Sequence, residues 1–438
     1  MKIAIASDLH LGFGKGTERE NEAFDQAKEA FELALREKAD LLLLAGDIFD
    51  SDVPSQETWL DAFRLFSVLR GGKGKGKFSV KRVKGDSEEI FECTGCIPVI
   101  AIAGTHEFRS RDFRNALEVL QEAGCMVYLH AAKAFFELGG ETIAVQGLSG
   151  VPEKKALDAL RLWNPQPEPG AVNILLLHQG IKEFLPFDDD MIASISLSDL
   201  PAGFDLVVDG HLHWHSDRSM PDRRFLLPGS TVITQLKKQE SEGEKGICIF
   251  DTKEKKLGFI PLPRQRKFLF AAINFKEAAK EKVLHEAESK IEELLSNCGA
   301  PGKPLVRLKL KGSLAKGVAS GDIDLSPVLQ KFCGRAVVSI DRDFAETEFI
   351  HKLAELRSAQ EQKRSIAAMG FEILQRNLAE TGFDGAFDVK RIFDLLAEGE
   401  TEKVVQLLSS MEKSESETAG AKSEKPGAKR PAKLQDFS

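Results

Sequence analysis

Histidine and aspartate residues recur at points where a short apolar segment of the sequence ends. Five motifs carry them: "SDLHLG", "AGDIFD", "GTHEFR", "LHQG" and "DGHLHWH". The candidate residues in these motifs are Asp8, His10, Asp47, Asp50, His106, His178, His211, His213 and His215. Imidazole nitrogens and carboxylate oxygens are both common ligands of divalent metals. The set therefore predicts a metal site, provided that the fold brings the five motifs together.

The spacing within two of the motifs suits chelation of a single ion. In "DLH" and in "HLH" the candidate ligands are two residues apart. An extended backbone places such residues on the same face. An aspartate such as Asp47 can also bridge two cations that lie about 3.5 to 4 Å apart. A mixed imidazole and carboxylate set favours manganese, iron or zinc over magnesium, and we expect two Mn²⁺ ions, with Fe or Zn as alternatives.

Each motif must be positioned by the apolar segment that precedes it. These segments are residues 2–7, 41–46, 98–104, 173–180 and 206–211. Their pattern is typical of central strands covered on both faces, and an amphipathic helix is predicted over about 20–37. Parallel strands end at one rim of a sheet, so the residues that follow them can converge. We therefore expect an α/β fold, a sandwich of sheets with helices outside.

The chain of 438 residues is too long for one simple core. The alternation of strands and helices, which becomes strand-rich after about 215, predicts a first domain over 1–265. A small α/β domain is predicted over 266–346 and a helical region over 347–412. Residues 413–438 consist mostly of Lys, Ser, Glu, Ala, Gly and Pro, so this tail is predicted to be disordered.

Composition narrows the class of protein. No run of 18 apolar residues occurs, so we expect no membrane span, and the N-terminus reads as a core strand and not as a signal peptide. Six cysteines over this length favour a reducing cytosol over a disulfide framework. The formal net charge of −8 argues against a uniformly basic nucleic-acid binder but permits local basic surfaces.

Two local basic segments are candidates for contact with nucleic acid. The stretch 71–97 contains Lys73, Lys75 and Lys77 among glycines and is predicted to be an exposed loop or hairpin. It is either a solvated insertion or a contact for a phosphate backbone, and charge alone does not decide between them. In the small α/β domain a second set of cations, on a predicted strand, could position DNA without reading bases. It consists of Arg307, Lys309 and Lys311.

In chain order the five motifs read DxH, GDxxD, GxHE, H and GHxH. Over residues 1–215 this series resembles the calcineurin-like metallophosphoesterase superfamily. The resemblance implies a four-layer core of two sheets flanked by helices. One position departs from the family pattern, because Thr105 stands where the family normally has asparagine before the histidine of the third motif.

The resemblance also implies a role for each motif residue. Asp8, His10 and His213 would hold a first metal, with Asp47 bridging to a second. His178, His211 and Asp47 would hold the second metal, and Thr105 would complete its set of ligands. Water activated by the two cations would attack phosphorus in line. His106 would be the catalytic histidine, which protonates the leaving oxygen or stabilises the transition state.

The motifs fix the reaction class but not the substrate. The segment "LPGSTVITQLKKQESEGEKGICIFD" (227–251) and the motif "LLLHQGI" resemble the Mre-eleven and SbcD type of DNA-repair nuclease, archaeal forms included. This resemblance implies a manganese-dependent 3′-to-5′ exonuclease on double strands and endonuclease on single strands. It further implies a small capping domain over 266–346, a homodimer, a Rad-fifty-type coiled-coil ATPase partner bound by the helices of 347–412, and a cytoplasmic, nucleoid-associated protein.

Two other functions stay open at this level. The chain could be a phosphodiesterase or phosphatase for small nucleotides, or a scaffolding subunit whose chemistry has decayed, for which Thr105 is the only hint. Several other residues have either two possible roles or no predicted role in the site. Asp50 either supports the site or caps the next helix, and His215 is expected to reach past the site. Cys93 and Cys96 form a single CxxC, which does not predict a zinc site.

Overall fold

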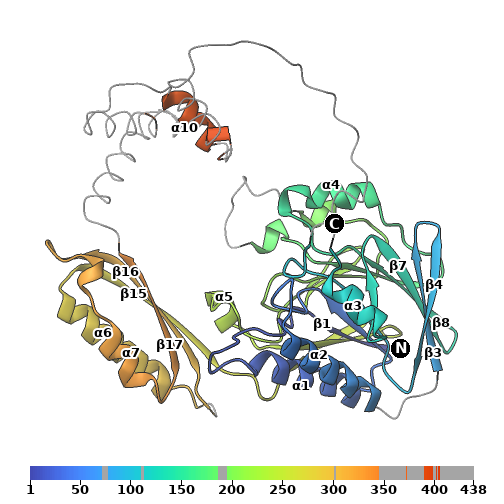
Figure 1. Ribbon diagram of the computed structural model, residues 1–438, viewed down its shortest axis with the longest axis horizontal. Coiled ribbons are helices and arrows are strands. Elements are labelled where there is room, and N and C mark those ends of the chain that lie inside the picture. Colours follow the sequence, from blue (N-terminus) through green and yellow to red (C-terminus); the bar gives the residue numbers. More distant parts are fainter. Residues whose placement is uncertain are drawn as a thin grey trace.

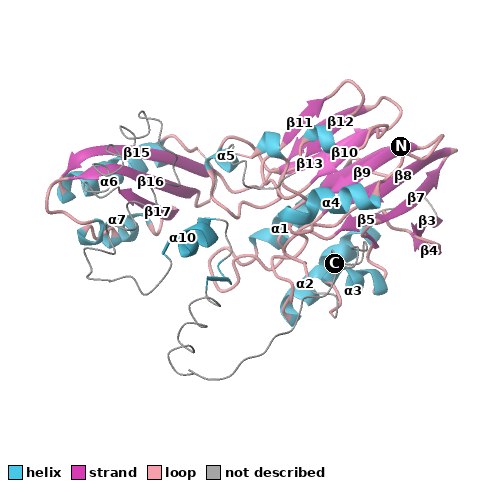
Figure 2. Ribbon diagram, turned by 90° about the horizontal axis from the view of Figure 1, so that it is seen from above, coloured by secondary structure: helices cyan, strands magenta, loops and turns pink. Residues whose placement is uncertain are grey.

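The computed structural model describes residues 1–71, 77–109, 113–185, 195–299, 302–344, 371, 389–397, 401, 403 and 404 (Figure 1). Two large sheets face each other in the first 265 residues, and a third, smaller sheet lies beside them (Figures 1 and 2). The predicted mixed α/β class is therefore confirmed. The first sheet has the order β14-β13-β1-β2-β5-β6 and the second the order β11-β12-β10-β9-β8-β7-β3-β4.

The first sheet contains most of the strands expected to lead into the site. Its strands are β1 (Lys2–Ala6), β2 (Leu41–Ala45), β5 (Val99–Ile102), β6 (Val127–Leu129), β13 (Gly246–Asp251) and β14 (Lys256–Pro261). Strands β1, β2, β5 and β6 pair in parallel, whereas β13 is antiparallel to both β1 and β14. The ends of β1, β2 and β5 therefore point to the same rim of this sheet, as expected of parallel neighbours.

The second sheet brings the later motifs to that rim. Its strands are β3 (Lys77–Lys84), β4 (Ser87–Thr94), β7 (Ala132–Leu138), β8 (Glu141–Gly147), β9 (Val172–Leu177), β10 (Leu206–Asp209), β11 (Ser216–Ser219) and β12 (Arg224–Leu227). Strands β8, β9, β10 and β12 are parallel. Strands β3, β4, β7 and β11 pair antiparallel with their neighbours.

Alternating side chains along the strands fill two separate cores. Ile3 and Ile5 of β1 face the second sheet and pack in the core between the sheets, whereas Ala4 and Ala6 face the helices on the other side. The helices that cover the first sheet are α1 (Glu22–Arg36), α2 (Gln56–Val68) and α3 (Ala116–Glu122). Helix α4 (Glu153–Trp163) covers the outer face of the second sheet. This gives four layers, with both faces of the central strands buried.

The small sheet is a separate unit of packing. It consists of β15 (Phe268–Ala278), β16 (Leu305–Leu314) and β17 (Val337–Phe344), all parallel. Helices α6 (Lys280–Ser296) and α7 (Ser326–Phe332) share an apolar core with this sheet. The short helix α5 (Lys238–Ser241) lies between the two parts of the molecule (Figures 1 and 2). The boundaries of the domains at 265 and 346 remain predictions.

The remaining elements are short or lie apart. Single 3-10 turns form η1 (Leu69–Gly71), η2 (Lys182–Phe184), η3 (Leu197–Asp199) and η4 (Ser320–Asp322). Of the helical region predicted over 347–412, the structure describes α10 (Val389–Ala397) and four single positions. The predicted tail over 413–438 lies outside the described residues. Among the helices that the structure describes, none combines the length and apolar character that crossing a bilayer requires.

The basic stretch 71–97 forms the β3–β4 hairpin at the edge of the second sheet, one of the two forms predicted for it. Lys73 and Lys75 lie outside the described residues, and Lys77 begins β3. Cys93 and Cys96 at the end of this hairpin are paired as a disulfide, whereas the other four cysteines are free. One such pair is not a disulfide framework, although the sequence did not predict it.

Candidate metal centre

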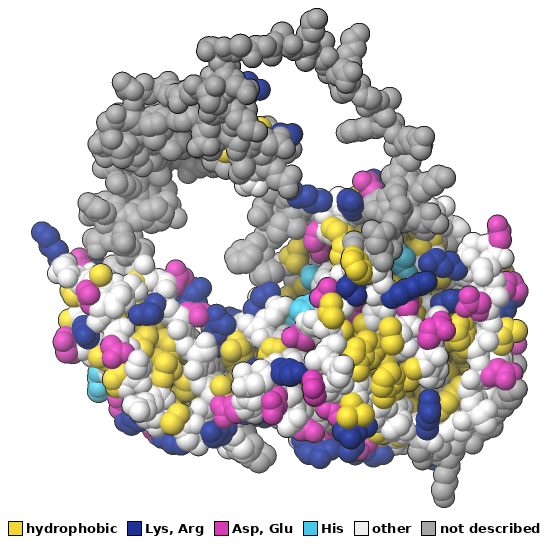
Figure 3. Space-filling model, in the orientation of Figure 1, with side chains coloured by type: hydrophobic (Ala, Val, Ile, Leu, Met, Phe, Trp, Pro, Cys, Tyr) yellow, Lys and Arg dark blue, Asp and Glu magenta, His cyan; other side chains and the backbone are white. Residues whose placement is uncertain are grey.

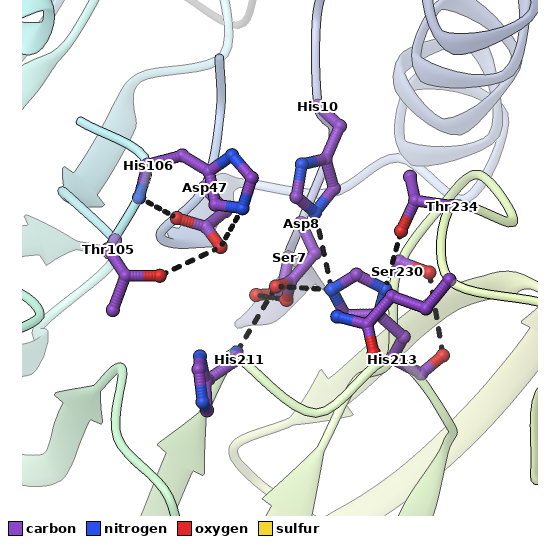
Figure 4. A network of polar contacts seen from close by, with 12 residues as sticks. Ser7, Asp8, His10, Asp47, Thr105, His106, His211, His213, Ser230 and Thr234 are labelled. Atoms are coloured by element: carbon purple, nitrogen blue, oxygen red, sulfur yellow. Dashed lines mark hydrogen bonds and ion pairs between the residues drawn. The ribbon is translucent and has the colours of Figure 1, made fainter. Parts of the chain in front are cut away.

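Figure 4 shows residues of four of the five motifs close together at one rim, and His178 of the fifth motif lies 3.1 Å from Asp47. Backbone hydrogen bonds join the strand ends of the first sheet, as between Asp8 N–H and the Gly46 carbonyl at 3.0 Å. A contact across the sandwich joins the second sheet to the first, because His178 Nδ1 donates to the Ala45 carbonyl at 2.8 Å. The convergence predicted from parallel strand ends is therefore present in the structure.

The first group of candidate ligands consists of Asp8, His10 and His213, whose ligand atoms lie within 4.8 Å of one another. His10 Nε2 lies 3.3 Å from His213 Nε2, and His213 Nε2 in turn lies 3.5 Å from Asp8 Oδ1. All three residues are buried. Two imidazole nitrogens and a carboxylate oxygen that face each other in a buried space are suited to share one cation.

The outward nitrogens of this first group are held by named partners. His10 Nδ1 donates to Asp50 Oδ1 at 3.0 Å, and His213 Nδ1 lies 2.8 Å from Thr234 Oγ1. Such contacts at the outer nitrogen fix the tautomer and leave Nε2 with a free lone pair. Asp50 therefore supports His10, and helix α2 is capped instead by Ser55. This settles the choice that the sequence left open for Asp50.

Behind His213 lies a buried ion pair that the sequence did not predict. Lys245 Nζ donates to the His213 carbonyl at 2.7 Å, to Ser230 Oγ at 2.8 Å and to Glu240 Oε1 at 2.9 Å. The Lys245 and Glu240 side chains are 4% and 1% exposed. Burial by itself would raise the pKa of Glu240, but His213 and Lys245 lower it to about 2. The Glu240 carboxylate therefore stays charged, and the contacts of Lys245 with Glu240 and with the His213 carbonyl fix the turn that carries His213.

The second group consists of Asp47, His178 and His211, again with ligand atoms within 4.8 Å of one another. His178 Nε2 lies 3.1 Å from Asp47 Oδ2. Burial by itself would lower the pKa of His178, but the Asp47 carboxylate raises it to about 10. Burial and the neighbouring His178 lower the pKa of His211 to about 4. One imidazole of this group thus carries a proton at neutral pH, and the other is ready to act as a ligand.

Several polar atoms near the second group are buried and have no hydrogen-bond partner among the described residues. They are His178 Nε2, Glu153 Oε2 and Asp209 Oδ2. A buried polar atom without a partner costs about 1–3 kcal/mol, which a bound cation would offset. The donor set and these unpaired atoms fit divalent metal ions, with Asp47 at a position where it could serve both groups.

Thr105 and His106 lie on the loop after β5 and both face Asp47 (Figure 4). Thr105 Oγ1 is 3.5 Å from Asp47 Oδ2, and the His106 backbone N–H donates to Asp47 Oδ1 at 2.8 Å. His106 Nδ1 donates to the Asp50 carbonyl at 2.9 Å, and its Nε2 lies 4.0 Å from Asp47 Oδ2. His106 also forms a third possible ligand group with His10 and Asp47. The sequence had given this histidine a catalytic role alone.

The backbone at the site is unusual and corrects one sequence argument. Asp8, His10, Asp47 and His211 have φ of +52°, +47°, +45° and +72°. L-residues rarely adopt this left-handed region, and its cost is typically met at functional sites. The expectation that "DLH" and "HLH" are extended segments with both side chains on one face is therefore wrong. The paired ligands converge because the chain turns, and the turn is held by contacts from other strands.

The glycines of the motifs are required by close packing. A Cβ at Gly104 would lie 2.1 Å from Asp47 Oδ1, and a Cβ at Gly210 would lie 2.1 Å from the Ala45 carbonyl oxygen. Glu107, which is fully buried, binds the loops together by accepting from Phe49 N–H at 2.6 Å and Gly104 N–H at 2.7 Å. Burial raises the pKa of Glu107 to about 8. Its place beside His106 in "GTHEFR" was the signal that the sequence offered.

The other histidines lie away from the two groups. His215 Nδ1 donates to the Leu227 carbonyl at 3.1 Å, and its ring stacks on Phe259. Burial lowers the pKa of His130 to about 4, His285 is exposed on α6, and His351 lies outside the described residues. Figure 3 shows small areas of histidine at the surface near the centre of the molecule and one more at its left edge. This agrees with the burial of most of the motif histidines.

The basic residues expected to contact DNA lie on β16 of the small sheet. Arg307 Nε donates to Asp341 Oδ2 at 2.8 Å, and Lys309 Nζ lies 3.2 Å from Asp343 Oδ2. Lys311 is exposed. Two of the three cations are thus paired with carboxylates of the neighbouring β17, which reduces the charge they offer to a phosphate.

Comparison with known proteins identifies the family of the part that carries the site. Residues 1–215 match the family model described as calcineurin-like phosphoesterase. They form a calcineurin-like phosphoesterase domain. The match ends after the last histidine motif and covers all five motifs, so the phosphoesterase domain includes both candidate ligand groups.

The relatives of the whole chain are more distant. The chain is 26% identical over 367 residues to the double-strand break repair protein MRE11 of Mus musculus, covering 70% of this chain and 50% of the relative. It is 24% identical over 323 residues to the DNA double-strand break repair protein Mre11 of Sulfolobus acidocaldarius, covering 72% and 76%. The protein of that name in Saccharolobus solfataricus is 26% identical over 259 residues. The chain spans about half the length of the mouse relative.

Proposed function

We propose that this chain is a metal-dependent phosphodiester hydrolase that cuts DNA at double-strand breaks. The observation that carries the proposal is the position of Asp47. Its carboxylate belongs to one ligand group with His178 and His211 and to another with His10 and His106. A carboxylate shared by two cation sites is the arrangement that two-metal phosphoryl chemistry requires.

When bound, two divalent cations would activate water and neutralise charge on the phosphoryl oxygens. Asp8, His10 and His213 would hold one cation, and Asp47, His178 and His211 the other. The group that Asp47 forms with His10 and His106 shares His10 with the first site, so the Asp47 carboxylate could also serve the first cation. We assign His106 the transfer of a proton to the leaving oxygen. Its Nδ1 donates to the Asp50 carbonyl and keeps its own proton, so the transferred proton would come from Nε2 of the doubly protonated ring. Since the His106 side chain is 41% exposed, it can meet a substrate from solvent.

The assignment of DNA as substrate is supported by the relatives, which are named as double-strand break repair proteins. We propose manganese as the metal, with 3′-to-5′ cleavage of double strands and endonucleolytic cleavage of single strands. The small sheet would hold the DNA backbone, with Lys311 and the paired Arg307 and Lys309 exchanging their carboxylate partners for phosphates. The stretch 71–97, with Lys73, Lys75 and Lys77, remains a second candidate contact.

We also propose two protein partners. A second copy of the chain would pack on α2 and α3, where Leu60, Phe63 and Val119 are exposed in an apolar area (Figure 3). A Rad-fifty-type coiled-coil ATPase would bind the helical region over 347–412, of which α10 carries Ile392 and Leu395. Removal of residues after 358 should leave metal binding intact and abolish co-purification with such an ATPase, whereas retained association would place the interface elsewhere.

Digestion of a linear duplex labelled at its 3′ or 5′ end, with Mn²⁺ and with Asp47→Asn as the inactive control, tests the proposal. Release of mononucleotides from 3′ ends and cutting of a closed single-stranded circle are the expected results. Turnover of cyclic or mononucleotide esters with an intact duplex would favour the small-nucleotide enzyme. Normal metal content without turnover of either substrate would favour a scaffolding subunit.

A further inference from the structure

Helix α4 begins with a carboxylate that approaches the second ligand group from outside the five motifs. Glu153 Oε1 lies 3.7 Å from His211 Nε2. The same oxygen accepts from the Gly180 backbone N–H at 2.9 Å, two residues after His178. One side chain therefore contacts both segments that carry the histidines of the second group.

The other carboxylate oxygen of Glu153 is not used by the protein. Oε2 is buried and has no hydrogen-bond partner among the described residues. A buried carboxylate oxygen left without a partner is costly unless a positive charge lies near it. As the first residue of α4, Glu153 could instead serve only as a favourable acid at a helix N-terminus. That simpler role explains neither the contact with His211 nor the burial of Oε2.

The segment before Glu153 is packed against the loop where this chain departs from its family. Gly150 N–H donates to the Ala103 carbonyl at 2.8 Å, and a Cβ at Gly150 would lie 3.0 Å from the Thr105 backbone nitrogen. Thr105 offers the second group a hydroxyl that lies 3.5 Å from Asp47 Oδ2. A hydroxyl is shorter and a weaker neutral ligand than the carboxamide normally present there. The position thus leaves the second group one donor short.

We propose that Glu153 compensates for Thr105: its carboxylate, 3.7 Å from His211 Nε2, adds the negative charge that orients the His211 ring and strengthens the second metal site once a cation is bound. This inference rests on the proposed metal-dependent function. Carboxylates that hold a metal-binding imidazole orient the ring and make it more basic. Their removal typically lowers metal affinity about 10- to 100-fold. Glu153 is in this sense a positioning residue for His211.

Calorimetric titration of the metal-free full-length chain with Mn²⁺ tests this without any substrate. Glu153→Gln keeps an oxygen for the Gly180 N–H but removes the charge, so we expect one of two sites to weaken about 10- to 100-fold. Glu183→Gln is the matched control, because Glu183 accepts from the Leu197 backbone N–H with both oxygens and lies on η2. Glu153→Asp, which keeps the charge on a shorter arm, should give an intermediate affinity.

A second variant makes the compensation itself testable. Thr105→Asn should restore most of the affinity that Glu153→Gln loses, and it should tighten the second site less when Glu153 is present. Two sites of parental affinity in Glu153→Gln would overturn the proposal, as would a gain from Thr105→Asn that does not depend on residue 153. A fall in melting temperature alone would assign Glu153 to the helix terminus. If the protein fails to cut DNA while Mn²⁺ binds as predicted, only the proposed nuclease function is overturned, and the role of Glu153 stands.

Discussion

The two ligand groups of the metal centre are braced in different ways. In the first group each outer imidazole nitrogen has a side-chain partner, Asp50 for His10 and Thr234 for His213, and a buried ion pair lies behind the turn. In the second group the outer nitrogen of His178 donates to a backbone carbonyl, and the nearby Glu153 Oε2 and Asp209 Oδ2 are buried without a hydrogen-bond partner among the described residues. The first group is thus assembled by the protein alone, whereas the second depends on a cation for part of its stability.

Because the two groups are braced differently, the two cation sites next to Asp47 should differ in metal affinity. Asp47 pairs with His178 in the structure, so a cation at the second group must replace a proton as well as bind. We therefore expect the first group to bind metal more tightly, and activity to depend steeply on Mn²⁺ concentration. Two sites of equal affinity would remove the distinction.

The largest effect is expected at His106, which contacts Asp47 but braces neither group. His106→Ala should lower the rate of duplex-end hydrolysis by about 10²- to 10⁴-fold, because it removes the proton donor to the leaving oxygen. Metal stoichiometry should be unchanged, as measured by calorimetry and elemental analysis. Loss of one bound metal in this variant would instead make His106 a ligand, in the group it forms with His10 and Asp47.

The next effect concerns the brace behind the first group. Lys245→Met leaves the buried Glu240 carboxylate unpaired, so we expect the free energy of unfolding to fall by about 3–5 kcal/mol. Lys238→Met is the control on α5, the short helix that carries Glu240, since its pair with Glu242 is exposed and should contribute about 0.5 kcal/mol or less. Urea denaturation measures both. Equal losses would show that the buried pair does not brace His213.

A smaller effect is expected from restoring the family's amide. Thr105→Asn should tighten the second metal site about tenfold, which corresponds to about 1.4 kcal/mol of binding free energy. It should leave the first site unchanged, because Thr105 faces Asp47 and the second group. Calorimetric titration with Mn²⁺ measures both affinities. A variant that tightens both sites equally would show that Thr105 acts through Asp47 and not on the second site itself.

The last expected effect is a dependence of metal affinity on pH, which is gradual and involves no substitution. Since Asp47 raises the pKa of His178 to about 10, this imidazole is protonated at pH 7 to 9 in the metal-free protein. Binding must release that proton, so affinity at the second group should rise about tenfold per pH unit over this range. Calorimetric titrations in buffers of different ionisation enthalpy should show the release of about one proton for each metal ion bound at the second group. An affinity that is independent of pH would mean that His178 is already neutral.

The sequence alone singled out the candidate ligands because the relevant signals are local. Short apolar runs identified strands β1, β2, β5, β9 and β10, and the residue types after them, Asp and His with glycine, identified the chemistry. The order of the five motifs then indicated the family that the comparison found for residues 1–215. Asp47 was singled out as a shared ligand on its chemistry, and the structure places it in two groups.

The contacts that hold the candidate ligands in place could be found only from the tertiary structure. Thr234, Lys245 and Glu153 lie far along the chain from the ligands that they approach or brace, and no spacing rule connects them. The sequence also did not predict the left-handed backbone at Asp8, His10, Asp47 and His211, since the local preference of these residues disfavours that conformation. Such turns exist because contacts from other strands outweigh their cost of about 1–3 kcal/mol each, and those contacts form only when the two sheets pack together.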